Sequence, residues 1–216
     1  TMEETVRIPA GPLSLEGLLG RRPGADGLVV THPHPLYGGD MHNDVVEALV
    51  DAYARAGFTT LRFNFRGTGG SEGRFENGEG ETEDVRHAAA LLAASGSSAI
   101  HLAGYSFGTW VNARALDRMP EIRDVVMVSP PVDFMDFSFL GLEPRIGLVV
   151  TGERDEIAGA SHVEALVPRW NPKATFRVIP GADHFYHGRT GALRAVLEEH
   201  LAAPGGLATG GSVHGD

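Results

Sequence analysis

The chain has 216 residues, of which 42% are hydrophobic and 21% are charged, as in globular proteins that bury one substantial core. It contains no cysteine, which excludes disulfides, thiol catalysis and cysteine-ligated zinc and favours a cytoplasmic protein, and no apolar run approaches the roughly 18 residues of a membrane span. The net charge of −10 argues against nucleic acid and anionic membrane surfaces as partners.

Apolar periodicity predicts an opening hairpin and then strands that alternate with helices. Strands are expected at residues 5–8, 13–19, 27–31, 58–63, 99–103, 125–128, 146–150 and 175–179. Helices are expected at residues 45–53, 82–94, 110–116, 163–170 and 193–201. This alternation predicts an α/β fold, with a mostly parallel, twisted sheet and helices on both faces. One domain is expected over residues 1–203, followed by a Gly-rich flexible tail at residues 204–216.

The stretch Gly104-Tyr105-Ser106-Phe107-Gly108 lies between a predicted buried strand and a predicted helix. It matches the pattern G-x-S-x-G, in which a sharp turn projects a serine from the edge of a sheet. The two glycines remove the Cβ atoms that would crowd such a turn. The start of the following helix offers unpaired N–H groups to a developing negative charge. Ser106 is therefore the candidate nucleophile.

A serine hydroxyl needs a base, and the base needs an anion that fixes its tautomer. In an open parallel sheet such groups gather at the carboxyl ends of the strands. Asp155 follows the strand predicted at 146–150, and His184 follows the strand predicted at 175–179. The order Ser106, Asp155, His184 along the chain is the order that hydrolases with this turn use.

Alternatives stay open for both partners of the serine. Asp133 follows the preceding strand and competes for the role of acid, and His187 is the alternative base. In a purely structural role, Asp155 would cap the next helix. Asp183, directly before His184, is expected to shape the turn.

These motifs resemble those of the α/β-hydrolase family, and the resemblance covers roughly residues 5–203. It implies the α/β-hydrolase fold, with Ser106 as nucleophile, Asp155 as acid and His184 as base. The loop His32-Pro33-His34-Pro35-Leu36-Tyr37-Gly38-Gly39 is further similar to that of small, cap-less bacterial hydrolases related to dienelactone-hydrolase-like proteins. Dienelactone hydrolases themselves use a cysteine, which this chain lacks.

A tetrahedral intermediate also needs N–H donors for its oxyanion. One donor is expected at Phe107, directly after the nucleophile. The other is expected in the His-Pro-His-Pro loop, whose prolines have no N–H, and this leaves His34 or Leu36. The family usually has His-Gly here, where this chain has His32-Pro33, and by position relative to that pair the resemblance favours His34.

Three histidines near this loop, His32, His34 and His42, raise the alternative of a metal site. No Asp, Glu or Cys at ligand spacing completes such a site, so packing within the loop is expected, and neither a metal nor another cofactor is predicted. Arg66, in a glycine-rich turn, is expected to fix the loop beside the site rather than to bind substrate.

Only residues 129–145 separate the strand at 125–128 from the next strand, which is too few for a lid domain. The pocket is therefore expected to be shallow, open and suited to small substrates. The large apolar residues of this connection are expected mostly in the core, with one or two lining an acyl pocket: Phe134, Phe137, Phe139 and Leu140.

The sequence thus predicts a serine hydrolase that cleaves small carboxylic esters through an acyl-enzyme on Ser106, as a monomer or homodimer. A thioesterase or a peptidase would use the same three residues. The alternative from a different class is a hydrolase-fold binding protein without turnover, because a fold by itself does not imply an activity. The presence of all three side chains favours an enzyme.

Overall fold

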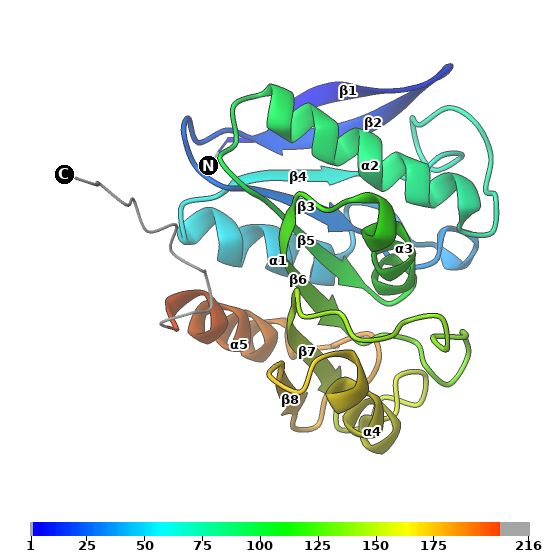
Figure 1. Ribbon diagram of the computed structural model, residues 1–216, viewed down its shortest axis with the longest axis vertical. Helices are drawn as coiled ribbons and strands as arrows, with labels where there is room; N and C mark the ends of the chain where they lie inside the picture. The colour runs from blue at the N-terminus through cyan, green and yellow to red at the C-terminus, as the bar shows by residue number, and fades with distance from the viewer. Residues whose placement is uncertain (1, 204–216) are drawn as a thin grey trace.

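The computed structural model describes residues 2–203, in which eight strands form one sheet (Figure 1). The strands are β1 (Glu4–Ala10), β2 (Leu13–Gly20), β3 (Gly27–Thr31), β4 (Thr59–Phe63), β5 (Ile100–Tyr105), β6 (Ile122–Val128), β7 (Ile146–Gly152) and β8 (Thr175–Ile179). Their order in the sheet is β1-β2-β4-β3-β5-β6-β7-β8. β2 is antiparallel to both β1 and β4, and every other neighbouring pair is parallel. The tail predicted at residues 204–216 lies outside the described residues.

Within residues 2–203, α-helices cover both faces of the sheet, as predicted (Figure 1). They are α1 (Asp44–Arg55), α2 (Glu79–Ala94), α3 (Phe107–Ala115), α4 (Ala160–Trp170) and α5 (Thr190–Ala202), with short 3-10 turns η1 (Pro35–Tyr37) and η2 (Leu116–Arg118). α1 and α5 pack on one face, and α2, α3 and α4 pack on the other. None of these helices combines the length and the apolar character that a membrane crossing requires.

Side chains that alternate along the central strands build one hydrophobic core on each face. In β3, Leu28 and Val30 belong to the core beneath α1 and α5, whereas Val29 belongs to the core beneath α2, α3 and α4. Because both faces are covered, all residues of β3 are buried, and the strand is a continuous apolar run in the sequence. The two cores hold the sheet, and the sheet sets the positions of the loops at its carboxyl edge.

Element boundaries differ from the predicted ones mainly where helices begin. α2 begins at Glu79 instead of residue 82, because the Glu81 carboxylate accepts the N–H groups of Gly78 at 2.7 Å and of Glu76 at 2.9 Å. This capping interaction lies among glycines and glutamates, where apolar periodicity carries no signal.

His32 ties two loops of the carboxyl edge together, directly after β3 ends. Its Nδ1–H donates to the Pro33 carbonyl at 2.7 Å, so its Nε2 accepts the Phe65 N–H at 3.0 Å. The ring is fully buried and lies against the Phe65 ring. Both contacts require the neutral imidazole, and burial lowers the pKa of His32 to about 4.

We expect His32 to make the stability of the fold depend on pH. Its pKa is about 4 in the folded protein and 6.5 ordinarily. Its contribution to the free energy of unfolding is therefore complete above about pH 6.5 and is lost as the pH falls toward 4. At about 1.4 kcal/mol for each pKa unit, the loss is about 3 kcal/mol. Urea unfolding of the wild type and of His32→Gln at pH 7.5 and 4.5 measures this loss, which should be smaller in the variant by about that amount. All other residues are the same in both proteins, so their contributions cancel, and an equal loss in the two would contradict this role.

Candidate active site

Ser106 lies in the sharp turn between β5 and α3. Its backbone has φ 52° and ψ −119°, and a positive φ costs a non-glycine residue about 1–3 kcal/mol. A Cβ at Gly104 would lie 2.7 Å from the backbone of Gly108, and a Cβ at Gly108 would lie 2.5 Å from the carbonyl oxygen of Thr31. The predicted need for glycine at both positions is confirmed, because the turn presses α3 against β3 and β5.

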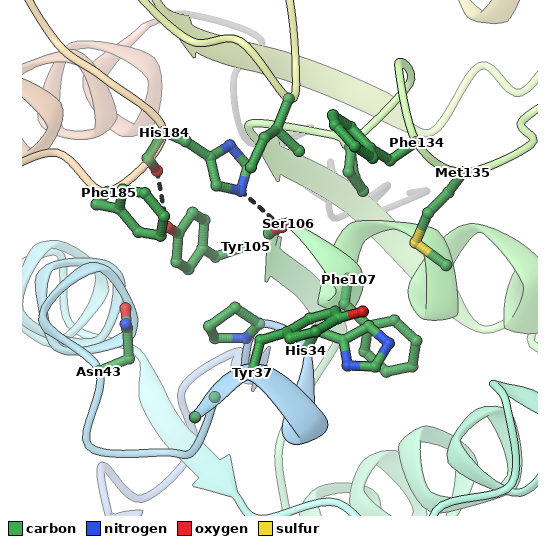
Figure 2. A pocket seen from close by; sticks show the side chains of 15 residues that line it. His34, Tyr37, Asn43, Tyr105, Ser106, Phe107, Phe134, Met135, His184 and Phe185 are labelled. Atoms are coloured by element: carbon green, nitrogen blue, oxygen red, sulfur yellow. Dashed lines mark hydrogen bonds between the residues drawn. The ribbon is translucent and has the colours of Figure 1, made fainter.

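The three side chains predicted to act together meet at this edge of the sheet. Ser106 Oγ lies 2.8 Å from His184 Nε2 (Figure 2), and His184 Nδ1 lies 2.9 Å from each carboxylate oxygen of Asp155. Because a carboxylate only accepts hydrogen bonds, Nδ1 carries the proton, and Nε2 is left to accept the Ser106 hydroxyl. All three residues are at most 7% exposed. The arrangement can transfer the serine proton to an imidazole that an anion supports.

Asp155 is held by the turn that follows β7. Its Oδ1 accepts the N–H groups of Ile157 at 2.9 Å and of Ala158 at 2.7 Å. Burial acts to raise the pKa of this carboxyl, but the His184 ring, the Ala158 N–H and the Ser129 hydroxyl outweigh burial and lower the pKa below its usual value. Asp155 therefore carries a negative charge at neutral pH.

His184 lies in a turn after β8 that Asp183 shapes, as expected from the sequence. The Asp183 Oδ1 accepts the N–H groups of Phe185 at 3.1 Å and of His187 at 3.4 Å. On the inner side, the Tyr105 hydroxyl donates to the His184 carbonyl at 2.7 Å (Figure 2). The residue before the candidate nucleophile thus also fixes the backbone that carries the candidate base.

The two competing residues have other partners. Asp133 accepts the Gly159 N–H and contacts Nδ1 of His162, each at 2.8 Å. His187 is exposed, and its ring contacts Asp183 at 3.1 Å. Both side chains are thus engaged outside the Ser–His–Asp group.

Three N–H groups of the loop after β3 are already used within the loop. The Leu36 N–H donates to His34 Nδ1 at 3.2 Å, and the N–H groups of Tyr37 and Gly39 donate to the His34 carbonyl at 3.1 and 3.0 Å. His34 and Phe107, the first residue of α3, line the cavity beside the nucleophile. Of the two donors that the sequence left open, Leu36 is engaged, and the role of His34 stays a prediction.

The histidines that raised the metal alternative make separate contacts. His32 uses one ring nitrogen for the Pro33 carbonyl in its own loop and the other for the Phe65 N–H in the loop after β4. The His34 ring is partly buried, which lowers its pKa, and it packs at centroid distances of 4.6, 5.1 and 4.8 Å against Tyr37, Phe75 and Phe107. His42 is exposed. Among residues 2–203, no three His, Cys, Asp or Glu side chains form a group that could hold a metal ion.

Arg66 fixes the loop after β4, as expected. Its guanidinium contacts Asp84 at 2.8 Å and also pairs with Glu76. Its backbone N–H donates to the same Asp84 carboxylate at 2.9 Å. These bonds hold the loop whose Phe65 N–H reaches His32.

A cavity of about 550 Å³ opens over Ser106. Its walls come from the loop after β3, the connection after β6 and the turn that carries His184 (Figure 2). Three aromatic side chains at this cavity are largely exposed, namely Tyr37 at 86%, Phe134 at 75% and Phe185 at 58%. The lining residues include no Lys, Arg, Asp or Glu, so the cavity is apolar apart from a few neutral polar groups.

The connection between β6 and β7 contains neither a helix nor a lid, and its aromatic residues have different fates. Phe137 is 6% exposed and packs in the core, as expected. Phe134 lines the cavity, which agrees with the expectation of one or two pocket residues. The core position expected for Phe139 is wrong, because this ring is 44% exposed beside a separate hollow on α2 and α3.

Sequence reasoning missed several side chains of the site. Asn43, the N-cap of α1, lines the cavity, and so does Phe185. Ser129 and Tyr186 lie behind Asp155 and share a hydrogen bond of 2.8 Å. A signal was present, since Ser129 directly follows β6 and Tyr186 comes two residues after His184.

Comparisons with known proteins agree with this architecture. Residues 33–148 match the sequence pattern of the family described as the alpha/beta hydrolase fold. An uncharacterized protein of Rickettsia prowazekii (strain Madrid E) is 38% identical over 189 residues, which cover 83% of this chain and 79% of the relative.

Two solved structures have the same fold over nearly their whole length. An alpha-beta serine hydrolase homologue from Coxiella burnetii superposes with a TM-score of 0.82 at 36% identity, covering 94% of this chain and 99% of the other. A serine hydrolase without lid from Xanthomonas campestris gives a TM-score of 0.83 at 29% identity, covering 92% and 93%. The predicted fold is confirmed, and the chain belongs to the α/β-hydrolase family.

Proposed function

We propose that this chain is a serine hydrolase that cleaves small, uncharged carboxylic esters through an acyl-enzyme on Ser106. The observation that carries the proposal is the 2.8 Å contact of Ser106 Oγ with His184 Nε2 inside the cavity, with Asp155 behind the ring. A buried hydroxyl, imidazole and carboxylate in series are what nucleophilic catalysis by serine requires.

In the proposed acylation step, His184 takes the proton of Ser106 while Oγ attacks the ester carbonyl. The negative charge of Asp155 stabilises the imidazolium that forms. His184 then gives the proton to the leaving alcohol, and the acyl group stays on Ser106. In the second half of the reaction, His184 takes a proton from water while the water oxygen attacks the acyl carbonyl. The bond to Ser106 Oγ then breaks, His184 returns the proton to Ser106, and the carboxylic acid leaves.

The negative charge of the tetrahedral intermediate would lie between two backbone N–H groups. Phe107 supports this because it begins α3, where N–H groups have no partner within the helix and the helix dipole favours an anion. His34 is preferred over Leu36, because the Leu36 N–H already donates to the His34 ring.

The walls of the cavity support the choice of an uncharged substrate. An ionised group on a substrate would lose its hydration in the cavity, and no Lys, Arg, Asp or Glu among the lining residues would compensate for that loss. Phe134, Met135 and Ile157 offer apolar contact to an acyl or aryl group. A volume of about 550 Å³ is in the range of small-molecule sites, and within residues 2–203 no lid covers a longer chain beyond the cavity.

Loss of the nucleophile or the acid should nearly abolish turnover. We expect Ser106→Ala and Asp155→Asn each to lower kcat for a short-chain aryl ester by about 10³-fold or more. Asp133→Asn is the matched control, because its amide oxygen can still accept the Gly159 N–H, and it should stay near wild type. A fluorophosphonate probe with peptide mapping should label Ser106. Labelling at another residue, or a folded Ser106→Ala protein that keeps most of its activity, would contradict the serine mechanism.

The oxyanion site can be seen directly in a phosphonate adduct. A crystal structure of this adduct should place a phosphonyl oxygen within hydrogen-bond distance of the Phe107 and His34 N–H groups. His34→Ala keeps that N–H, so it should retain most of kcat, whereas loss of one oxyanion donor costs about 10²–10³. An oxygen that points instead to the Leu36 N–H or to a histidine ring would show that the loop acts differently.

Substrate preference should follow the apolar wall of the cavity. We expect kcat/KM to fall from butyrate to palmitate esters and to fall further for esters that carry a carboxylate. Phe134→Ala should lower kcat/KM for butyrate esters by about tenfold, because an acyl group would cover part of this exposed ring, and partial cover contributes somewhat less than the roughly 1.5–3 kcal/mol of full burial. Phe139→Ala, in the same connection but outside the cavity, is the matched control. Equal losses in both variants would contradict the role of Phe134.

A further inference from the structure

Strained backbone is concentrated around the Ser–His–Asp group. Among residues 2–203, four non-glycine residues have a positive φ, and three of them lie here: Ser106 at 52°, Ser129 at 49° and Tyr186 at 57°. The fourth is Asn77, a residue type that tolerates this conformation. Such strain persists only where the surroundings hold it, and it often accompanies function. The turn explains Ser106 but not the other two.

Ser129 and Tyr186 are joined by their side chains behind Asp155. Ser129 Oγ lies 2.8 Å from the Tyr186 hydroxyl, and the Ser129 hydroxyl is close enough to the Asp155 carboxylate to lower the pKa of that carboxyl. Both residues are fully buried. Neither lines the cavity, so neither is placed to contact a substrate.

The chemistry of the groups fixes the direction of this chain of hydrogen bonds. An ionised carboxylate only accepts, so the single Ser129 hydroxyl proton points to Asp155. The Tyr186 hydroxyl must then donate to Ser129 Oγ. Burial raises the pKa of Tyr186, which keeps that proton on the phenol. In this arrangement Ser129 donates to Asp155, and the Ser129 oxygen in turn accepts a hydrogen bond from Tyr186.

The backbone of each residue is locked in place by the sheet edge. The Ser129 N–H donates to the Val150 carbonyl at 2.7 Å, across from β6 to β7. The Tyr186 N–H donates to the Asp183 carbonyl at 3.3 Å, and the Tyr186 carbonyl accepts the Arg189 N–H at 2.8 Å. The two hydroxyls therefore connect the loops after β6 and β8 to the acid that follows β7.

We propose that Ser129 and Tyr186 are positioning residues that orient the Asp155 carboxylate toward His184 and stabilise its charge. This proposal rests on the proposed function, since it assigns these residues to the same reaction. The left-handed backbone at both positions is then the cost of aiming the Ser129 hydroxyl at a buried carboxylate and the Tyr186 hydroxyl at Ser129.

The charged and titratable groups around Asp155 determine what a pH profile would report. They are His184, which contacts the carboxylate, and the buried phenols of Tyr105 and Tyr186. Burial raises the pKa of both phenols, so they stay protonated over the working range. Asp133 reaches the acid loop only at the Gly159 N–H. Changes at acidic pH would therefore report on the Asp155 carboxylate and its contact with His184.

The test compares the pH dependence of kcat and KM in four variants with the wild type, using a short-chain aryl ester. Ser129→Ala and Ser129→Gly both remove the hydroxyl, but glycine also relieves the strain at a positive φ. Tyr186→Phe removes only the outer hydroxyl. Tyr53→Phe is the matched control, because Tyr53 is a fully buried tyrosine whose hydroxyl has no partner among the described residues.

Both Ser129 variants should lower kcat about tenfold with KM unchanged, since a hydrogen bond to a charged group is lost outside the cavity. Without the donor the Asp155 carboxylate takes up a proton more readily, so the acidic limb of kcat/KM should move to higher pH. Tyr186→Phe should shift kcat and the limb in the same direction by a smaller amount. Tyr53→Phe should leave both unchanged.

Several results would overturn the proposal. One is a Ser129→Gly enzyme with wild-type kcat and pH profile, because the hydroxyl would then be irrelevant. Another is a loss of kcat with an unmoved acidic limb, which would indicate a structural role only. If Ser129→Ala does not fold, Tyr186→Phe decides by the same criteria. A wild-type protein that neither cleaves esters nor reacts with fluorophosphonate would instead refute the proposed function, so the two failures are distinguishable.

Discussion

The positive φ of Ser106 is the constraint on which the rest of the site depends. It turns the chain from β5 into α3 so tightly that Gly104 and Gly108 have no room for a Cβ. The strain is held because β5 is central in the sheet and α3 packs into the core on one face. A serine held in this way does not need to be ordered at the moment of reaction, and its oxygen already lies against His184.

Buried polar contacts between loops hold the groups that face this serine. His32 joins the loops after β3 and β4, and the Tyr105 hydroxyl joins β5 to the His184 turn. Ser129 and Tyr186 link the loops on either side of Asp155. Each contact saturates a polar group that would be costly to bury alone, and each crosses between strands that the sheet keeps parallel. Loops at a carboxyl edge can therefore be rigid without regular structure.

Charge is distributed unequally between the surface and the cavity. The chain carries a net charge of −10, while the residues that line the cavity include no Lys, Arg, Asp or Glu. The single buried anion of the site, Asp155, is shielded from the cavity by the His184 ring to which it bonds. In the proposed reaction, a substrate would therefore meet an apolar wall and one polar pair, which supports the proposal of a neutral carbonyl compound over an ion.

The sequence by itself determined the elements and the three candidate residues, because apolar periodicity, paired glycines and strand ends are local properties. The resemblance favoured Asp155 over Asp133, but both follow strands, and only the folded chain shows which one reaches His184. It also favoured His34 over Leu36 by position, and the structure adds the physical reason that the His34 ring takes the Leu36 N–H. Tertiary structure likewise decided where the rings of Phe134 and Phe139 lie, and it brought the hydroxyls of Ser129 and Tyr186 together behind Asp155. Each depends on which distant groups compete for one partner, and such competition has no trace in local sequence.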